Sequence, residues 1–280
     1  MPEILAEWSL PGGYAVSLPL FLTLGSLAAL LVSMAKAGFG GSVGLLSVPM
    51  LIYACGGETD LALGIMLPVL IVCDYVSVVK WWRRWQWRSV WLLVPGTVVG
   101  IAAGWLAILA FKRYEAAGNQ GFTDAVLKLG VGVIAVGFVG LQVFRSLRRR
   151  PLPFRPVLWQ GTCFGAAAGL TSTLAHAAGP ITTMYMLPQG LPKDRFVASL
   201  TLFTLIGNHL KLAPYIGLNL MNPASLLAAA ALVPAVVGGA LLGVYLNKRI
   251  DARHFTGIVY TLLLGAGAHL IYNGAKALWF

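Results

Sequence analysis

The sequence predicts an all-α integral membrane protein built from two inverted-topology repeats, each a re-entrant or broken helical hairpin plus three transmembrane helices. Composition is the first observation: of 280 residues, 58% are hydrophobic and 10% charged, and mean hydropathy is +0.81. A soluble domain carries about 25% charged residues. The second observation is a series of apolar segments of membrane-spanning length. The third is a pair of related segments predicted to cross the membrane in opposite directions.

Eight apolar segments have close to the ~20 residues that a spanning helix needs. They are 14–35, 61–81, 88–111, 123–145, 156–174, 196–217, 224–246 and 254–275. Two further apolar runs, 42–55 and 180–190, are too short to cross the bilayer untilted.

The basic residues give the predicted orientation. The net charge of +11 would indicate nucleic-acid binding in a soluble protein, but most Lys and Arg residues fall in loops at 80–88, 145–155, 193–195 and 248–253. The positive-inside rule predicts that these four loops are cytoplasmic. The acidic N-terminal segment is then extracytoplasmic, and we expect a multi-pass protein of the bacterial inner membrane with no nucleic-acid partner.

An internal repeat follows from two matched segments, "LVPGTVVGIAAG" (93–104) and "LVPAVVGGALLG" (232–243). The charge pattern sends the first outward and the second inward, which is the signature of an inverted repeat and is typical of transporters. We therefore divide the chain in two. The N-terminal repeat, 1–150, contains hairpin 14–57 and helices 61–81, 88–111 and 123–145, followed by the basic loop 145–155. The C-terminal repeat, 151–280, contains hairpin 156–190 and helices 196–217, 224–246 and 254–275.

The two hairpin tips carry the candidate site. "KAGFGG" (36–41) is the first tip and "AHAAGPITT" (175–183) the second. Ser42 suits an N-cap, and Pro180 suits the first position of a helix after Gly179. Opposed helix N-termini favour anions, and glycine lets a ligand approach the backbone. The predicted substrate-binding residues are Lys36, Gly38, Gly40, Gly41, Ser42, Thr171, Ser172, His176, Gly179, Thr182, Asn208 and Lys211.

Lys36 and His176 occupy equivalent places when "AKAG" is aligned with "AHAA". A lysine at the bilayer centre costs roughly 2.5–3.5 kcal/mol, so Lys36 is expected to face a cavity and to have a partner. The alternative is that its side chain reaches the inner interface. His176 is either a core histidine bonded to a backbone carbonyl, a substrate ligand or a proton carrier.

Asp74 and Lys211 each have more than one interpretation. Asp74 pairs with Lys36 in the empty state, carries a proton for coupling, or forms a structural ion pair. Its repeat mate, Asn208, is neutral. Lys211 either provides a second cation for substrate or extends outward to the interface.

The order of "KAGFGGSVGLLSVPML" (36–51), "GAAAGLTSTLAHAAGPITTMYMLP" (165–188) and "GNHLKL" (207–212) followed by Tyr215 resembles the sulfite exporter TauE/SafE family. The resemblance covers nearly the whole chain. One departure is the second tip, which reads "AHAAGP" where the family often has a glycine cluster. The resemblance implies secondary transport, often export, of small sulfur-containing anions such as sulfite, sulfoacetate, other sulfonates and thiosulfate.

The predicted function is therefore transport of a small anion by alternating access, with proton coupling through Asp74 or His176 as one alternative. Import, another small organic anion and an anion channel are further alternatives. An intramembrane serine hydrolase using Ser172 and His176 lacks an evident acidic partner and a G-x-S-x-G motif. We expect no enzymatic activity, no cofactor and no metal. The sequence leaves the oligomeric state, the anion, the direction and the coupling ion open.

Overall fold

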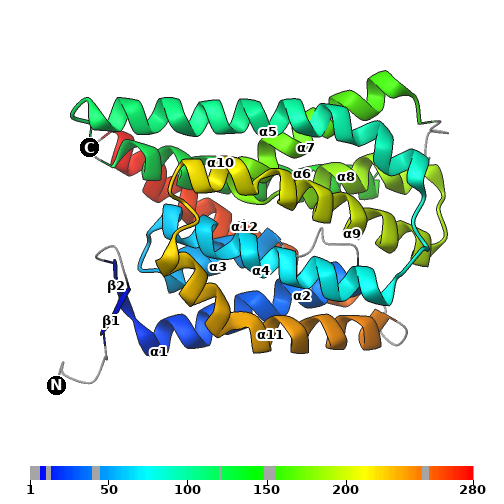
Figure 1. The fold of residues 1–280 in the computed structure, drawn as a ribbon, viewed down its shortest axis with the longest axis horizontal. Helices are drawn as coiled ribbons and strands as arrows, with labels where there is room; N and C mark the ends of the chain where they lie inside the picture. The colour runs from blue at the N-terminus through cyan, green and yellow to red at the C-terminus, as the bar shows by residue number, and fades with distance from the viewer. Residues whose placement is uncertain are drawn as a thin grey trace.

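The computed structural model describes residues 7–10, 14–39, 45–119, 121–147, 156–247 and 252–279, which form a helical bundle preceded by one short β-hairpin (Figure 1). The elements are β1 (Glu7–Leu10), β2 (Tyr14–Ser17), α1 (Leu18–Leu20), a π-turn η1 (Phe21–Gly25), α2 (Ser26–Phe39), α3 (Ser47–Ala54), α4 (Thr59–Lys80), α5 (Trp87–Ala116), α6 (Phe122–Leu147), α7 (Leu158–Ala175), α8 (Ala178–Met186), a 3-10 turn η3 (Leu187–Gln189), α9 (Lys193–Leu210), α10 (Leu212–Gly217), α11 (Pro223–Asn247) and α12 (Ala252–Trp279).

Six helical segments within the described residues are long and apolar enough to cross a membrane. They are Leu18–Gly38, Thr59–Lys80, Trp87–Ala116, Phe122–Gly140, Lys193–Gly217 and Pro223–Asn247. The predicted span 156–174 is not among them, because small and polar residues, including Thr171, Ser172 and Thr173, lower the hydropathy of the 18-residue helix α7. The predicted multi-pass helical protein is confirmed, with six candidate spans in the part of the chain that the structure describes.

The first span begins later than the sequence predicted. Residues 14–17 were assigned to a helix, but β2 pairs antiparallel with β1, with Glu7 opposite Ser17. The helix starts at Leu18, where Pro19 lies in the first turn. Tyr14 and Val16 favour a strand, and apolar composition alone does not distinguish a strand from a helix end.

Helices α5 and α7 lie in close contact because glycines line the contact (Figure 1). A Cβ atom at Gly96 would collide with the Thr162 carbonyl oxygen, and one at Gly100 with that of Ala166. Small residues at a spacing of four allow helix backbones to approach this closely. Since higher numbers on α5 meet higher numbers on α7, the two helices run parallel.

Helices α2 and α11 form a second contact of the same kind. A Cβ atom at Gly239 would lie 2.5 Å from the Leu30 carbonyl oxygen, and one at Gly243 would meet Met34. These helices also run parallel. By contrast, α6 and α12 run antiparallel, since Gly132 meets Gly267 while Gly274 meets Ala125.

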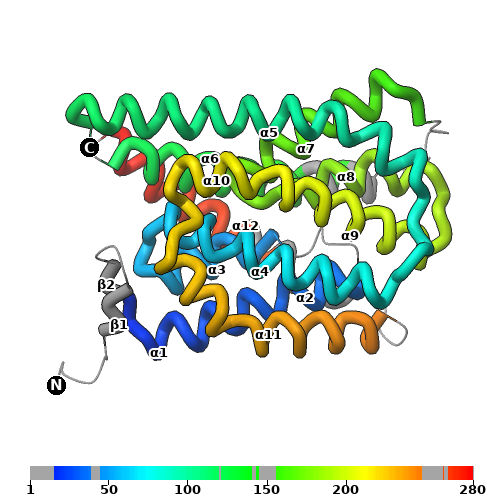
Figure 2. The backbone as a smooth tube through the Cα atoms, viewed as in Figure 1, coloured from blue at the N-terminus to red at the C-terminus, as the bar shows by residue number. Residues whose placement is uncertain are grey.

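Helices α4 and α9 lie between these pairs and run antiparallel to each other (Figure 2). Asp74 on α4 accepts a hydrogen bond from Asn208 near the end of α9. Arg84, which follows α4, pairs with Asp194 at the start of α9. The last turn of α4 and the first turn of α9 therefore lie at the same end of the bundle.

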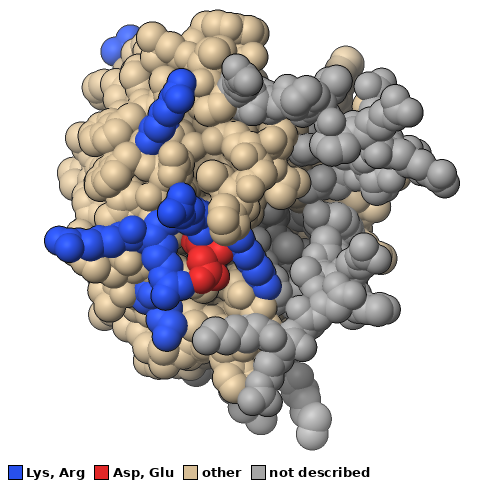
Figure 3. Space-filling view, turned by 90° about the vertical axis from the view of Figure 1, so that its right-hand side faces the viewer, with Lys and Arg blue, Asp and Glu red and all other residues tan. Residues whose placement is uncertain are grey.

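That end of the bundle is basic. Arg84 Nη1 lies 2.5 Å from Asp194 Oδ2, and Lys193 Nζ donates to the Asn247 carbonyl oxygen at 2.6 Å. These bonds bring the loop after α4, the start of α9 and the end of α11 together. Figure 3 shows this face, where Lys and Arg side chains surround a small acidic patch. The basic residues at 148–150, 155, 248 and 249 of the predicted loops lie outside the described residues.

Helix α11 thus ends where α5 begins, so the segments 93–104 and 232–243 run in opposite directions. The helix over 196–217 is not continuous as predicted: Lys211 separates α9 from α10, and Pro214 follows in α10. A proline removes a backbone donor and disfavours a continuous helix through this point.

The second hairpin breaks at the predicted residues. Helix α7 ends at Ala175, His176 adopts the left-handed conformation with φ 50°, and α8 starts at Ala178. The predicted start at Pro180 is two residues late; proline is tolerated inside the first turn because the first N–H groups of a helix have no intrahelical acceptor. Helix α8 then returns toward the basic end (Figure 1).

Candidate functional site

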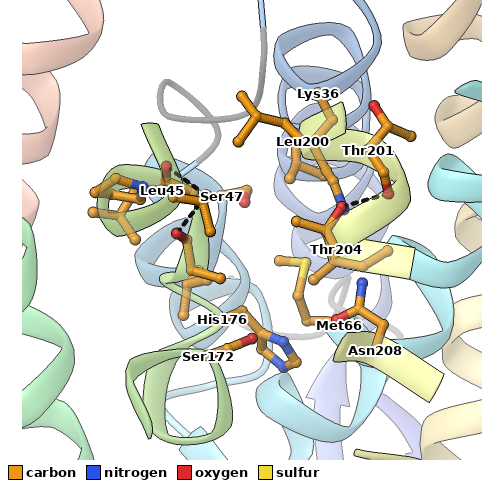
Figure 4. A pocket seen from close by; sticks show the side chains of 17 residues that line it. Lys36, Leu45, Ser47, Met66, Ser172, His176, Leu200, Thr201, Thr204 and Asn208 are labelled. Atoms are coloured by element: carbon orange, nitrogen blue, oxygen red, sulfur yellow. Dashed lines mark hydrogen bonds between the residues drawn. The ribbon is translucent and has the colours of Figure 1, made fainter. Parts of the chain in front are cut away.

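A cavity lies where the ends of α2 and α7 meet the starts of α3 and α8, against α4 and α9 (Figure 4). Its volume is about 40 Å³, which is room for roughly three water molecules or one small oxyanion. The lining residues are Val32, Lys36, Leu45, Ser47, Val48, Met66, Leu70, Ser172, His176, Ala178, Gly179, Pro180, Thr182, Leu200, Thr201, Thr204 and Asn208.

Lys36 contributes a positive charge to the cavity wall. It lies in the last turn of α2, where the negative end of the helix dipole favours a cation. Its ammonium nitrogen is 2.5 Å from Asp74 Oδ1, and the Asp74 side chain is completely buried. Asp74 and Lys36 therefore form an ion pair, which agrees both with the empty-state pair and with the structural ion pair among the interpretations of Asp74. The side chain of Lys36 is 9% exposed.

Two cavity-lining side chains of α9 also hold Asp74. Thr204 Oγ1 lies 3.0 Å from Asp74 Oδ1, and Asn208 Nδ2 donates to Asp74 Oδ2 at 2.7 Å. Thr204 and Asn208 are one helical turn apart, so they face the same side of α9. Figure 4 shows both on the side of the cavity that carries Lys36, with Ser47 across from them.

His176 closes one end of the cavity. Its Nε2 lies 3.0 Å from the carbonyl oxygen of Leu63 on α4, and its Nδ1 lies 2.9 Å from Lys211 Nζ. A carbonyl oxygen only accepts hydrogen bonds, so Nε2 carries a proton. Nδ1 is then the acceptor for Lys211, which means that the arrangement holds a neutral imidazole.

Lys211 lies behind His176 and is fully buried. Besides the bond to His176, Nζ donates to the Ser172 carbonyl oxygen at 3.2 Å. The Tyr215 hydroxyl donates to the Thr173 carbonyl oxygen at 2.8 Å. The Tyr215 hydroxyl thus satisfies the Thr173 carbonyl at the broken end of α7, where a helix terminus leaves carbonyls without intrahelical donors. The Ser172 carbonyl also accepts from the His176 N–H at 3.0 Å.

The N-terminal turn of α8 provides a polar backbone surface. Ala178, Gly179 and Thr182 line the cavity together with Pro180. The first N–H groups of a helix point away from its body and carry partial positive charge. This turn and the ammonium group of Lys36, whose charge is balanced by Asp74, give the cavity hydrogen-bond donors that suit a small anion.

The predicted residues divide into four groups. Those that reach the cavity are Lys36, Ser172, His176, Gly179, Thr182 and Asn208. Lys211 and Asp74 lie directly behind this layer. Gly40, Gly41 and Ser42 lie outside the described residues.

Gly38 and Thr171 do not line the cavity. Gly38 packs against Gly243 of α11, and its carbonyl oxygen accepts a hydrogen bond from Asn247. The Thr171 hydroxyl lies 2.8 Å from the Ala167 carbonyl oxygen within its own helix. The small size of Gly38 therefore allows α2 to pack against α11. The Thr171 hydroxyl bonds a backbone carbonyl of its own helix instead of facing the cavity.

Thr204 was missed from the sequence, as were Thr201, Ser47 and Met66. Thr204 and Thr201 precede Asn208 by four and seven residues, so all three lie on one face of a helix. This spacing could have identified the two threonines from the sequence. Met66 and Ser47 carried no such signal, because apolar residues and hydroxyls are common in membrane helices.

The model of one protein family, described as Sulfite exporter TauE/SafE, matches residues 25–270. This range includes every described residue of the cavity. No curated protein and no solved structure matches the chain.

Proposed function

The chain belongs to the sulfite exporter TauE/SafE family, and from this premise we propose that it is a secondary transporter that exports a small sulfur-containing anion. The family consists of membrane transporters, not enzymes. The proposed substrates are sulfite, sulfoacetate or another organosulfonate, and thiosulfate. The substrate is held in the cavity between the two hairpins.

The observation that carries this proposal is the combination of a small cavity with a buried cation on its wall. Lys36 is within the apolar interior and reaches the cavity. Intramembrane ionisable residues that line a cavity mark substrate pathways. A volume of about 40 Å³ favours a compact oxyanion over a large organic anion.

Alternating access between two inverted repeats is part of the proposal. In the repeat, α5 corresponds to α11 and α7 corresponds to α2. Helix α5 packs in parallel against α7 through glycines, and α11 packs against α2 in the same way. The mates α4 and α9 run antiparallel, as do α6 and α12. In each parallel pair, a helix of the half 1–150 packs against a helix of the half 151–280. This matching arrangement supports two repeats related by inversion.

The basic end of the bundle is proposed to face the cytoplasm of a bacterial cell, with the N-terminus outside. Exposed tryptophans near this end support the assignment of a membrane interface, since Trp82, Trp87 and Trp91 are each more than half exposed. Indole rings concentrate at the headgroup level of bilayers. The positive-inside rule supplies the direction.

Transport by purified protein in proteoliposomes tests the proposal. We expect saturable uptake with counterflow for sulfite, thiosulfate or a sulfonate, which distinguishes a carrier from a channel. Lys36→Ala is expected to remove this flux because the cavity loses its cation. Lys128→Ala is a matched control, since Lys128 pairs with Asp124 on α6. Equal flux in Lys36→Ala and wild type would exclude Lys36 from the substrate site.

A further inference from the structure

We propose that Asp74 occupies the anion-binding groups of the cavity when substrate is absent, and that a substrate anion replaces it only when Asp74 takes up a proton. The inference rests on the proposed function, because it assumes that the cavity binds an anion. It adds that the coupling ion is a proton and that Asp74 carries it. For each negative charge of the bound substrate, the protein takes up one proton.

The groups that hold Asp74 are the groups that an oxyanion in the cavity would need. Lys36, Thr204 and Asn208 all line the cavity, whereas Asp74 is buried behind them. Their ammonium, hydroxyl and amide N–H groups already bind a carboxylate at 2.5, 3.0 and 2.7 Å. An ammonium group donates three hydrogen bonds, so Lys36 can turn from one oxyanion to another.

Charge balance connects this exchange to a proton. Lys36 and Asp74 together are neutral, so an entering monoanion leaves the buried site with one unbalanced negative charge. An unpaired charge in a low-dielectric interior is strongly unfavourable. A proton from water that binds Asp74 removes this charge. Lys36 and the anion then form the neutral pair that Lys36 and Asp74 formed before.

The hydrogen bonds around Asp74 accommodate both protonation states. The Thr204 hydroxyl has two acceptors at 3.0 Å, Asp74 Oδ1 and the Thr201 carbonyl oxygen, but only one hydrogen to donate. With Asp74 ionised, Thr204 donates to the carboxylate. With Asp74 protonated on Oδ1, the Thr204 oxygen accepts from it, and the single Thr204 hydrogen is available to the substrate anion or to the Thr201 carbonyl oxygen. One N–H of Asn208 still donates to Oδ2, and its other N–H is available to the anion.

Other groups near Asp74 in the described part of the chain give an alternative source of charge. They are Lys36 on α2, Cys73 beside it on α4, and His176 with Lys211 at the second hairpin tip. A positive charge on Lys211 would balance the anion without a proton. Lys211 lies behind His176, whereas Asp74 is in direct contact with the cation of the cavity, which favours Asp74.

Calorimetric titration of the full-length protein in detergent tests the linkage. The probes are methanesulfonate and isethionate, monoanions that do not titrate near neutral pH. Titration in two buffers of different ionisation enthalpy measures the protons taken up. We expect about one proton per anion and, by linkage, an apparent Kd that rises with pH.

Asp74→Asn is expected to bind the same anions with no proton uptake and a pH-independent Kd, because an amide cannot titrate. Asp124→Asn is the matched control: Asp124 pairs with Lys128 at 2.5 Å and accepts a bond from the Thr59 N–H, which an amide oxygen can replace. It should keep the wild-type linkage. Gel filtration and thermal unfolding report whether each variant is folded.

The wild-type measurement decides the inference even if Asp74→Asn does not fold. Binding of either sulfonate without proton uptake would overturn the inference and leave the proposed function intact. Proton uptake that persists in a folded Asp74→Asn would assign the proton to another group and would also overturn it. A wild type that binds neither sulfonate at any pH would overturn the linkage and exclude small sulfonates from the proposed substrates, while sulfite and thiosulfate are tested separately by transport.

Discussion

Lys211 Nζ lies 2.9 Å from His176 Nδ1, so two interruptions of helix meet in the interior of the bundle. His176 ends α7 in a left-handed conformation, and Lys211 separates α9 from α10. Lys211 Nζ also donates to the Ser172 carbonyl oxygen near the end of α7. This contact closes one end of the cavity and leads to the first prediction.

His176→Ala is expected to destabilise the protein by about 1–3 kcal/mol, because a buried donor of Lys211 loses its acceptor. Thermal unfolding in detergent measures the change. Lys211→Met removes the donor as well, so the double variant should be less destabilised than the sum of the two single variants. Strictly additive effects would show that the contact contributes nothing.

Lys36→Met is expected to be more damaging to stability than loss of a surface ion pair. It leaves the Asp74 carboxylate buried without a cation, which costs about 3–5 kcal/mol. Adding Asp74→Asn should restore most of that stability because no charge remains. Arg84→Ala, which breaks an exposed pair with Asp194, should cost only about 0–1 kcal/mol. No rescue in the double variant would contradict a direct Lys36–Asp74 interaction.

Thr204→Val retains side-chain volume but removes the hydroxyl between Asp74 and the cavity. In the proposed site this hydroxyl donates to the substrate anion, and a hydrogen bond to a charged group contributes about 1.5–3 kcal/mol, so we expect the KM for transport to rise roughly tenfold or more. Thr171→Val is the comparison, since that hydroxyl bonds within its own helix. Its KM should change less than about twofold; equal effects of the two variants would exclude a specific role for Thr204.

Gly100→Ala is expected to push α5 away from α7, because the added Cβ would collide with the Ala166 carbonyl oxygen. Overpacking of this kind costs about 1–3 kcal/mol. Gly137→Ala on α6 meets nothing within 4 Å and should be neutral or stabilising by up to about 1 kcal/mol, since alanine favours helix. Thermal unfolding of the two variants compares them directly. Equal stability would show that the α5–α7 contact tolerates a larger separation.

Single cysteines at opposite ends of the bundle report the orientation. Arg83→Cys and Ala117→Cys place thiols at exposed positions, in a background where the exposed Cys163 is replaced by Ala. A membrane-impermeant maleimide should label the thiol at 117 on intact cells and the thiol at 83 only after permeabilisation. The reverse pattern would place the basic end outside.

Much of the fold could be predicted from composition and local pattern. A bilayer gives backbone groups no hydrogen-bonding partner, so apolar segments of sufficient length must be helical, and the spans and the break at His176 followed. The exact helix ends did not follow: residues 14–17 pair as a strand, and Lys211 interrupts a segment that the pattern showed as continuous.

The sequence by itself determined that this is a helical membrane protein of the TauE/SafE family and that Lys36 and His176 needed partners in the interior. Only the tertiary structure decided which partners these are. Thr204 meets Asp74 across 130 positions of sequence, and Gly38 proved to be a packing residue against α11. Helical periodicity predicts which residues share a face of one helix, whereas contacts between helices depend on how their faces are oriented after packing, which one sequence does not encode locally.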